Sequence, residues 1–298
     1  MPCSETIARS RRVRNDRHQS IRRRSGRMEV ILHCGAHRCA TTSFQGYMTE
    51  NAQSLEHLGL VYWGPERARS IGLNNLDKLT PEVCAGLQRD LDACMHRGAR
   101  AVLISQENFV GSMVRNFACA SLYPNARERG YLLAKAFGGR VSKIALNIRS
   151  LDMYWASAAA YLFKRRNKSF EPERWSRIAN GNRSWRDVIM DFSGAFPGTA
   201  FQVFPFEEFC GQQRAQLEIL TGLAVPDTGK SYALNGTSRP APHGLNAQQS
   251  MKLSIEYAYD LAWLAAGADG LAELVSHTGT HDRGIAPEET GFEQRKST

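Results

Sequence analysis

The chain alternates short apolar runs with longer stretches in which apolar residues recur every three or four positions. Short apolar runs bounded by Gly, Pro or polar residues are typical of strands buried in a parallel sheet. Such runs predict four strands, at Val30–His33, Ala101–Ser105, Lys143–Ile148 and Ala200–Phe204. The polar residues that follow the runs mark where the strands end.

Helical periodicity separates the predicted strands. After the third strand, apolar residues from Leu151 to Leu162 keep the i, i+3, i+4, i+7 rhythm of an amphipathic helix. Similar patterns predict helices after position 41 and near Glu82–Met95, Arg127–Phe137, Ser184–Phe192, Gln212–Gly222 and Ala247–Ala266. Strands that alternate with helices pair in parallel and carry helices on both faces. We therefore predict a three-layer α/β/α fold whose ligands bind at the carboxyl ends of the strands.

Residues 28–278 are expected to form a single domain, and residues 279–298 a flexible tail. The Pro and Gly content of Tyr232–Gly244 predicts a loop. Residues 1–27 hold nine Arg against Glu5 and Asp16, so this segment carries +7 of the formal charge of +9. Such a segment could bind nucleic acid or anionic lipid, and it also resembles an organellar transit peptide. We favour a disordered extension, and expect no nucleic-acid partner for the nearly balanced folded body.

The seven cysteines are scattered and include no Cys-x-x-Cys pair, which favours reduced thiols over a disulfide framework or a metal site. We expect no metal. No run of 18 apolar residues predicts a transmembrane helix, and no secretory leader is apparent, so a cytoplasmic location is expected. Cys34 and Cys39 are interpreted as small apolar fillers, and His33 and His37 as turn residues.

The first predicted strand enters a turn that has the features of a phosphate-binding loop. Its residues are Gly35, Ala36, His37, Arg38, Cys39, Ala40, Thr41, Thr42 and Ser43. A strand, a turn and a helix in this order direct backbone N–H groups and a positive helix end toward one anion. The turn departs from the Walker pattern, because position 40 is Ala instead of Gly and position 41 is Thr instead of Lys. Its only cation is Arg38.

This turn resembles that of the sulfotransferases, P-loop proteins whose turn reads Pro-Lys-[Ser/Thr]-Gly-Thr-Thr and holds 3'-phosphoadenosine 5'-phosphosulfate (PAPS). Bacterial members are also similar in the Thr41-Thr42-Ser43-Phe44-Gln45 stretch. The resemblance covers residues 29–240 and implies a P-loop fold with PAPS as the sulfuryl donor. It places Arg38 where the family has Lys. Ala at position 40 suits this turn only if its backbone φ is negative.

Two further sites carry the resemblance. Arg149 ends a predicted strand and Ser157 follows eight residues later, as do the Arg and Ser that grip the donor's 3'-phosphate in the family. On a helical wheel Ser157 faces away from the apolar stripe. Glu107, at the end of another predicted strand, matches the position of the family's proposed general base. Asn235 matches a loop residue that helps to cover the donor.

The resemblance implies transfer of a sulfuryl group to a hydroxyl or amine, with Glu107 and Arg38 as the catalytic residues. Relatives suggest a small-molecule or glycan acceptor, and in particular a carbohydrate. Two alternatives stay open. A catalytically silent nucleotide-binding protein would explain the changes at positions 37, 38 and 40, whereas Thr41 disfavours a kinase. Arg149 alone could equally be a surface cation that pairs with Asp152.

Overall fold

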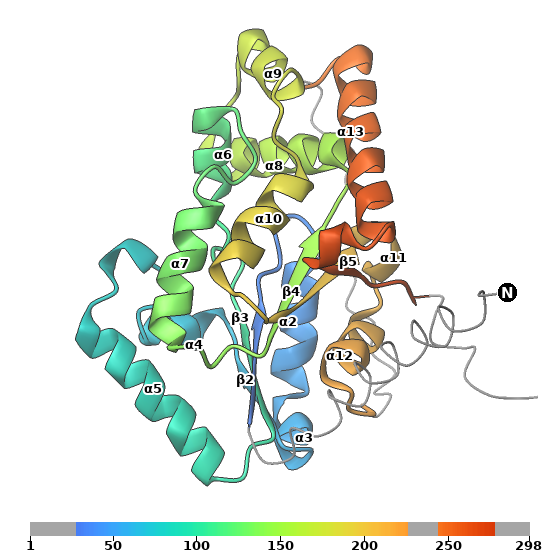
Figure 1. The fold of residues 1–298 in the computed structure, drawn as a ribbon. Coiled ribbons are helices and arrows are strands. Elements are labelled where there is room, and N and C mark those ends of the chain that lie inside the picture. Colours follow the sequence, from blue (N-terminus) through green and yellow to red (C-terminus); the bar gives the residue numbers. More distant parts are fainter. Residues whose placement is uncertain (1–27, 226–243, 278–298) are drawn as a thin grey trace, which may run out of the picture.

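A computed structural model describes residues 28–225 and 244–277 of the chain. Its centre is a sheet of six parallel strands (Figure 1). The strands are β1 (Glu29–His33), β2 (Leu60–Trp63), β3 (Ala101–Ser105), β4 (Lys143–Ile148), β5 (Ala200–Pro205) and β6 (Glu273–Leu274). The predicted α/β class and the parallel sheet are confirmed.

The strands lie in the order β2-β3-β1-β4-β5-β6, so β1 occupies the interior of the sheet. The loop that leaves β1 therefore lies between the ends of β3 and β4. Strands β2 and β6 were not predicted. The first has four residues, two of them half-buried, and the second has only two residues, too few to establish a pattern.

Helices fill the connections between strands. The helices before β4 are α2 (Thr41–Glu50), α3 (Ala52–His57), α4 (Pro65–Ser70), α5 (Pro81–His96), α6 (Met113–Cys119) and α7 (Ala126–Phe137). The later ones are α8 (Leu151–Arg166), α9 (Pro172–Ala179), α10 (Trp185–Ala195), α11 (Phe206–Phe209), α12 (Gln213–Thr221) and α13 (Ala247–Ala265). Two short 3₁₀ turns, η1 (Leu76–Lys78) and η2 (Ala268–Gly270), complete the described elements.

Alternate residues of each strand enter two separate cores, one on each face of the sheet. Leu32 and Ile104 point into the larger core, which α5, α7 and α10 cover. Ile31 and Leu103 point into the smaller core, which α2, α3 and α12 cover. Because successive side chains of a strand point to opposite faces, one central sheet supplies both cores. The result is the predicted three-layer arrangement.

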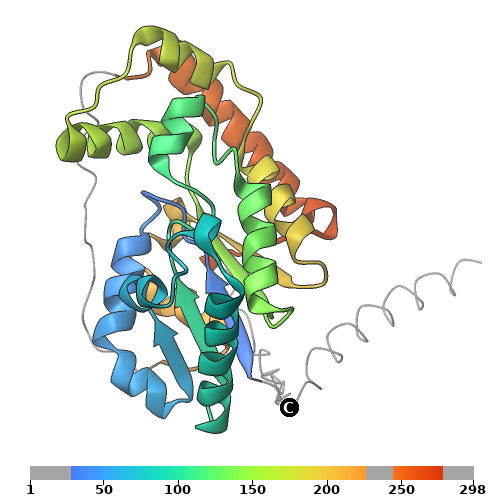
Figure 2. The same ribbon diagram turned by 90° about the vertical axis from the view of Figure 1, so that its left-hand side faces the viewer.

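A group of helices extends beyond the carboxyl ends of the strands. Helix α8 begins three residues after β4 ends, and it packs against α13, which returns alongside it and α9 (Figures 1 and 2). The Asp260 carboxylate of α13 accepts hydrogen bonds from the Ser184 hydroxyl and from the backbone N–H groups of Trp185 and Arg186 at the start of α10. These contacts join the last long helix to the helices around the carboxyl edge.

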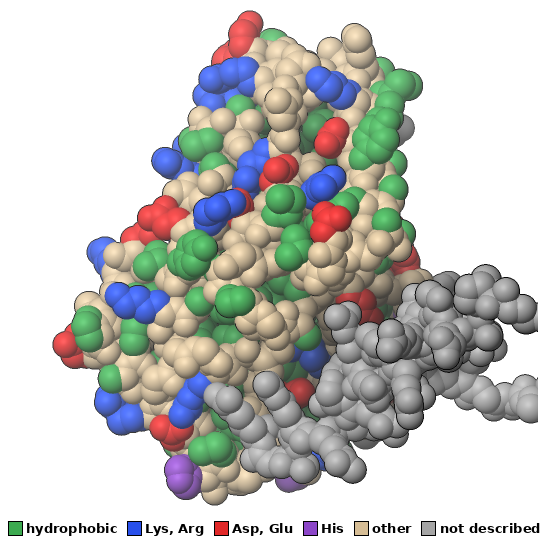
Figure 3. All heavy atoms as spheres, viewed as in Figure 1, with side chains coloured by type: hydrophobic (Ala, Val, Ile, Leu, Met, Phe, Trp, Pro, Cys, Tyr) green, Lys and Arg blue, Asp and Glu red, His purple; other side chains and the backbone are tan. Residues whose placement is uncertain are grey.

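Acidic and basic side chains are interspersed over the face seen in Figure 3. Within the described ranges, no helix combines the length and apolarity that crossing a bilayer requires. The predicted Arg-rich extension, the tail after residue 278 and Asn235 lie outside the described residues.

Candidate functional site

The loop between β1 and α2 folds tightly over the end of the sheet. The Thr41 hydroxyl donates a hydrogen bond to the Ala36 carbonyl at 2.9 Å, which closes the loop on itself. Gly35 permits this approach, because a Cβ atom there would lie 2.8 Å from Thr41 Cγ2 and 2.9 Å from His33 Cε1. The Thr41 hydroxyl proton is thus engaged within the loop, so Thr41 can offer an anion its backbone N–H but not its hydroxyl.

Two non-glycine residues of the loop have left-handed backbone conformations. Arg38 has φ 65° and Ala40 has φ 61°. The expected negative φ at position 40 is therefore not adopted. The left-handed conformation that Ala40 has instead costs a residue with a Cβ about 1 kcal/mol or more. Ala40 is also the N-cap of α2, which starts without a side-chain cap. The N-cap side chain therefore accepts no hydrogen bond from the backbone N–H groups of the first turn.

Arg38, Arg149 and Ser157 meet beside this loop. Arg38 Nε donates to Ser157 Oγ at 2.9 Å, and Arg149 Nη1 donates to the Arg38 carbonyl oxygen at 3.1 Å. The Arg38 guanidinium also lies 5.4 Å from the centroid of the Tyr161 ring, one helical turn beyond Ser157. Residues 119 positions apart thus form a single cluster between the β1 loop and α8.

The cluster holds two guanidinium groups and no carboxylate partner. Arg149 is only 7% exposed, and within the described parts of the chain neither it nor Arg38 forms an ion pair. Burial, and next the adjacent Arg149 charge, lower the pKa of Arg38. Arg149 Nε is buried and has no hydrogen-bond partner among the described residues. Two close cations with an unused buried donor are costly unless an anion joins them.

Nearby carboxylates are bound elsewhere. Asp152 accepts hydrogen bonds from the Ser150 and Ser250 hydroxyls, so the alternative in which it pairs with Arg149 is wrong. Glu207 accepts hydrogen bonds from the Ser150 backbone N–H and the Tyr257 hydroxyl. On its other side the Arg149 guanidinium lies 4.2 Å from the Phe206 ring centroid, which is an aromatic contact and supplies no counter-charge.

Glu107 lies on the other side of the β1 loop, in the turn that follows β3. It is half-buried, and its charge acts on both His37 and Arg38. Burial lowers the pKa of His37, and the charge of the Glu107 carboxylate raises it and so offsets part of that effect. The Arg129 guanidinium donates to the Asn108 and Phe109 carbonyl oxygens, which fixes the turn that carries Glu107.

The two histidines assigned to the turn have different roles. His37 lies in the loop, where its backbone N–H donates to the Tyr123 hydroxyl at 3.1 Å. His33 is instead the last residue of β1 and is fully buried, so its interpretation as a turn residue is wrong. Its ring contacts Ser105 Oγ and Asn147 Oδ1, both at 2.8 Å.

His33 is the centre of a buried polar network beneath the loop. Gln45 donates to Ser105 Oγ, and Gln216 donates to Asn147 Oδ1, so α2 and α12 join the three strands that meet there. Burial lowers the pKa of His33 to about 4, which keeps the ring neutral at pH 7. The only sequence signal for this network is a polar residue at the end of two apolar runs, His33 and Ser105, and one residue before the end of a third, Asn147.

Cys34 and Cys39 are fully buried, as expected of apolar fillers, and burial raises the pKa of both thiols. Among the described residues, no group of three or more His, Cys, Asp or Glu side chains could hold a metal ion.

The β1 loop suits a dianionic ligand, since a helix start without a side-chain cap and two guanidinium groups meet there.

Comparisons with known proteins add little to this picture. No family model matches the chain, and no curated protein matches its sequence. One solved structure similar to this chain is a sulfotransferase from Alicyclobacillus acidocaldarius, at 18% identity and a TM-score of 0.43, over 82% of this chain and 96% of that one. At this identity and TM-score the likeness establishes neither the family nor the activity.

Proposed function

We propose that this protein is a sulfotransferase that transfers a sulfuryl group from PAPS to a hydroxyl or amine of an acceptor. The resemblance to bacterial sulfotransferases favours a carbohydrate as that acceptor. The observation that supports the proposal is a pair of guanidinium groups that have no counter-ion among the described residues and lie beside a helix start without a side-chain cap. The phosphates of such a donor would supply the negative charge that both cations lack.

Each residue has a separate role in this proposal. The first-turn N–H groups of α2, together with Arg38, would hold the 5' end of the donor and stabilise the negative charge that develops on the leaving phosphate oxygen. Arg149 and Ser157 would hold the 3'-phosphate. In the structure the Ser157 hydroxyl accepts a hydrogen bond from Arg38 Nε, and its own proton would be donated to that phosphate.

Bound PAPS supplies an activated sulfuryl group, whose bond from sulfur to the 5'-phosphate oxygen breaks as the bond from sulfur to the acceptor forms. Glu107 would accept the proton that the acceptor hydroxyl or amine loses. Arg38 stays protonated throughout, so it stabilises the leaving group by charge alone. The chain's contribution is mainly positioning and charge stabilisation, as in phosphoryl transfer.

Direct binding of adenosine 3',5'-bisphosphate to the Arg149→Met variant tests the donor site. Loss of a charge-assisted hydrogen bond of ~1.5–3 kcal/mol predicts a fall in affinity of roughly ten- to a hundredfold by calorimetry. Arg177→Met, at an exposed position on α9, is the matched control and should bind as the wild type does. Unchanged affinity in Arg149→Met would remove this residue from the site.

The same variant has a second readout in the absence of ligand. If Arg149 is held for an anion, its replacement removes a buried charge that has no partner, so the melting temperature should stay the same or rise. The increase in melting temperature that bisphosphate gives the wild type should shrink. A fall of several degrees without ligand would instead make Arg149 a structural residue.

A catalytically silent binding protein is the second candidate, favoured by the strained Ala40. Turnover separates the two. With PAPS and an acceptor, Glu107→Gln should lower kcat by about a hundredfold or more while binding bisphosphate normally. A wild-type protein that binds bisphosphate but transfers no sulfuryl group from labelled PAPS in a cell extract would support the silent protein.

A further inference from the structure

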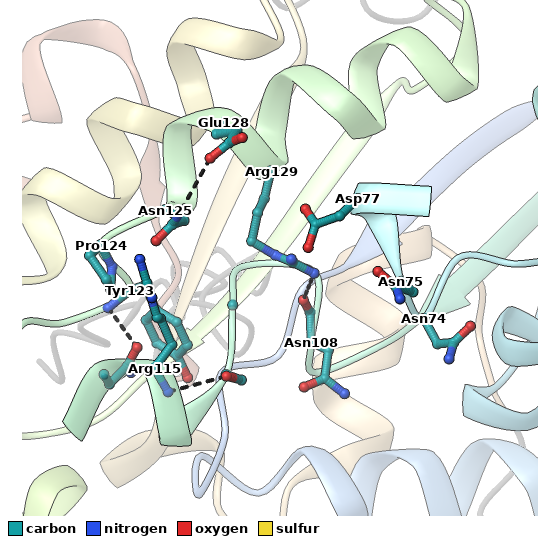
Figure 4. Close-up of a pocket in the computed structure, with 13 residues that line it drawn as sticks. Asn74, Asn75, Asp77, Asn108, Arg115, Tyr123, Pro124, Asn125, Glu128 and Arg129 are labelled. Carbon is teal, nitrogen blue, oxygen red and sulfur yellow. Dashed lines mark hydrogen bonds between the residues drawn. The ribbon is translucent and has the colours of Figure 1, made fainter. Parts of the chain in front are cut away.

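A polar cavity of about 550 Å³ lies on the far side of the turn that carries Glu107. It is enclosed by the η1 segment, the loop after β3, and the facing parts of α6 and α7 (Figure 4). Asn74 and Asn75 form one wall, Arg115 and Tyr123 the opposite wall, and Asn108 lies between them (Figure 4). None of these residues belongs to the donor site proposed above.

The cavity adjoins both halves of the proposed catalytic machinery. Asn108 lines it and is the residue directly after Glu107. Tyr123 lines it as well, and its hydroxyl accepts the hydrogen bond from the backbone N–H of His37 in the β1 loop. The lining thus includes the residue next to the proposed base and a side chain that is hydrogen-bonded to the proposed donor loop, although Glu107 itself does not line the cavity.

The lining favours a ligand rich in hydroxyl groups. Five of the lining residues are asparagines; Asn116 is hydrogen-bonded to Tyr123 and Tyr154, and the others lie at positions 74, 75, 108 and 125. Each amide offers donors and an acceptor on one rigid plane, which matches neighbouring hydroxyls. Pockets for phenols or steroids are predominantly apolar, and an apolar ligand that covered the Asn74 and Asn75 amides would leave them unpaired, at a cost of ~1–3 kcal/mol each.

The cavity also contains one cation without a counter-charge. Arg129 is balanced by the Asp77 and Glu128 charges, and its guanidinium is occupied by two carbonyl oxygens. Arg115 is exposed, and the described residues give its side chain neither an ion pair nor a hydrogen bond. An acidic substituent on the ligand could form an ion pair with Arg115.

From these features we infer that the cavity is the acceptor site and that it takes an acidic oligosaccharide, whose hydroxyls contact the asparagines and whose carboxylate or sulfate pairs with Arg115. This inference rests on the proposed sulfotransferase function for its catalytic meaning. The binding site itself stands on the cavity and its lining.

Calorimetry with two matched sugars tests the inference, using full-length protein saturated with adenosine 3',5'-bisphosphate. Tetragalacturonate should bind more tightly than its fully methyl-esterified form, and 2-naphthol should not bind. Arg115→Ala should weaken tetragalacturonate about tenfold and leave the ester unchanged, because only the ion pair is lost. Arg177→Ala removes the same charge outside the cavity and should behave as the wild type does.

Asn74→Leu provides a second variant, at an exposed position whose side chain forms no hydrogen bond with the described residues. It should weaken both sugars and leave bisphosphate binding intact. If bisphosphate binds but neither sugar does, or if Arg115→Ala and Asn74→Leu bind both sugars normally, the acceptor site is overturned and the donor site stands. If sugars bind through Arg115 but bisphosphate does not bind at all, the proposed function fails and the cavity's role as an acceptor site fails with it.

Discussion

At the scale of single residues, the spacing of side chains along the chain identified the candidate site better than the residue types alone did. The eight-residue spacing of Arg149 and Ser157 singled out two residues that the structure brings to the same loop through Arg38. Spacing could not reveal that Arg38 would donate a hydrogen bond to the Ser157 hydroxyl, or that the Thr41 hydroxyl would donate one to the Ala36 carbonyl. Both depend on rotamers that local sequence does not fix.

Ala40→Gly is a residue-scale test of strain in the β1 loop. Relief of the left-handed penalty of ~1–2 kcal/mol, less the ~0.5–1 kcal/mol that glycine adds in chain entropy, should raise the free energy of unfolding by roughly 0.5–1 kcal/mol. Urea denaturation measures it. Ala36→Gly, in the same loop but without a positive φ, should instead lower stability. A loss of stability in Ala40→Gly would show that the loop conformation costs alanine nothing.

At the scale of elements, the long periodic segments were predictable and the short ones were not. The apolar runs that became β1, β3, β4 and β5 are well bounded, and all four were predicted within one residue at each end. Short elements such as β2, α6 and β6 contain too few residues to show a period. Their formation depends on neighbours, because β2 pairs with β3 and β6 with β5.

Asp260 shows the same dependence on neighbours, since it caps a helix that begins 75 residues earlier. In sequence it is one of two acids in a long helix, and its carboxylate accepts hydrogen bonds from Ser184, Trp185 and Arg186. Asp260→Ala leaves the buried Ser184 hydroxyl and Trp185 N–H without this acceptor and should cost roughly 2–4 kcal/mol in urea denaturation. Asp260→Asn keeps one acceptor oxygen and should cost less.

Glu256→Ala, at an exposed position on the same helix, is the control and should change stability by less than about 0.5 kcal/mol. If Asp260→Ala were equally mild, the carboxylate would not be what anchors α10 to α13.

At the scale of the whole molecule, the His33 network joins the centre of the sheet to helices of the α2 and α12 layer. Its neutral ring makes stability depend on pH. The unfolded state, with an ordinary pKa near 6.5, binds more protons than the folded state, where the pKa is about 4. Stability is therefore fully present above pH 6.5 and is lost as pH falls toward 4.

Between pH 7 and pH 5 this group should account for a loss of roughly 2 kcal/mol. Burial raises the pKa of Asp260 to about 6, which changes stability in the opposite sense over the same range. The useful quantity is therefore the difference between wild type and His33→Gln at each pH. That difference should shrink by roughly 2 kcal/mol at pH 5, with the exposed His96→Gln as control for loss of an imidazole. A difference that is independent of pH would mean that His33 titrates alike in the folded and unfolded states.

The sequence by itself determined the α/β class, four of the strands, and the candidate residues of a loop that suits an anion, because local periodicity and turn composition reflect local geometry. Only the tertiary structure decided which charges lack partners and where a polar cavity lies. Burial and pairing depend on residues far apart in the chain, as when Arg38 and Ser157 meet across 119 positions. Local sequence patterns do not indicate such long-range contacts.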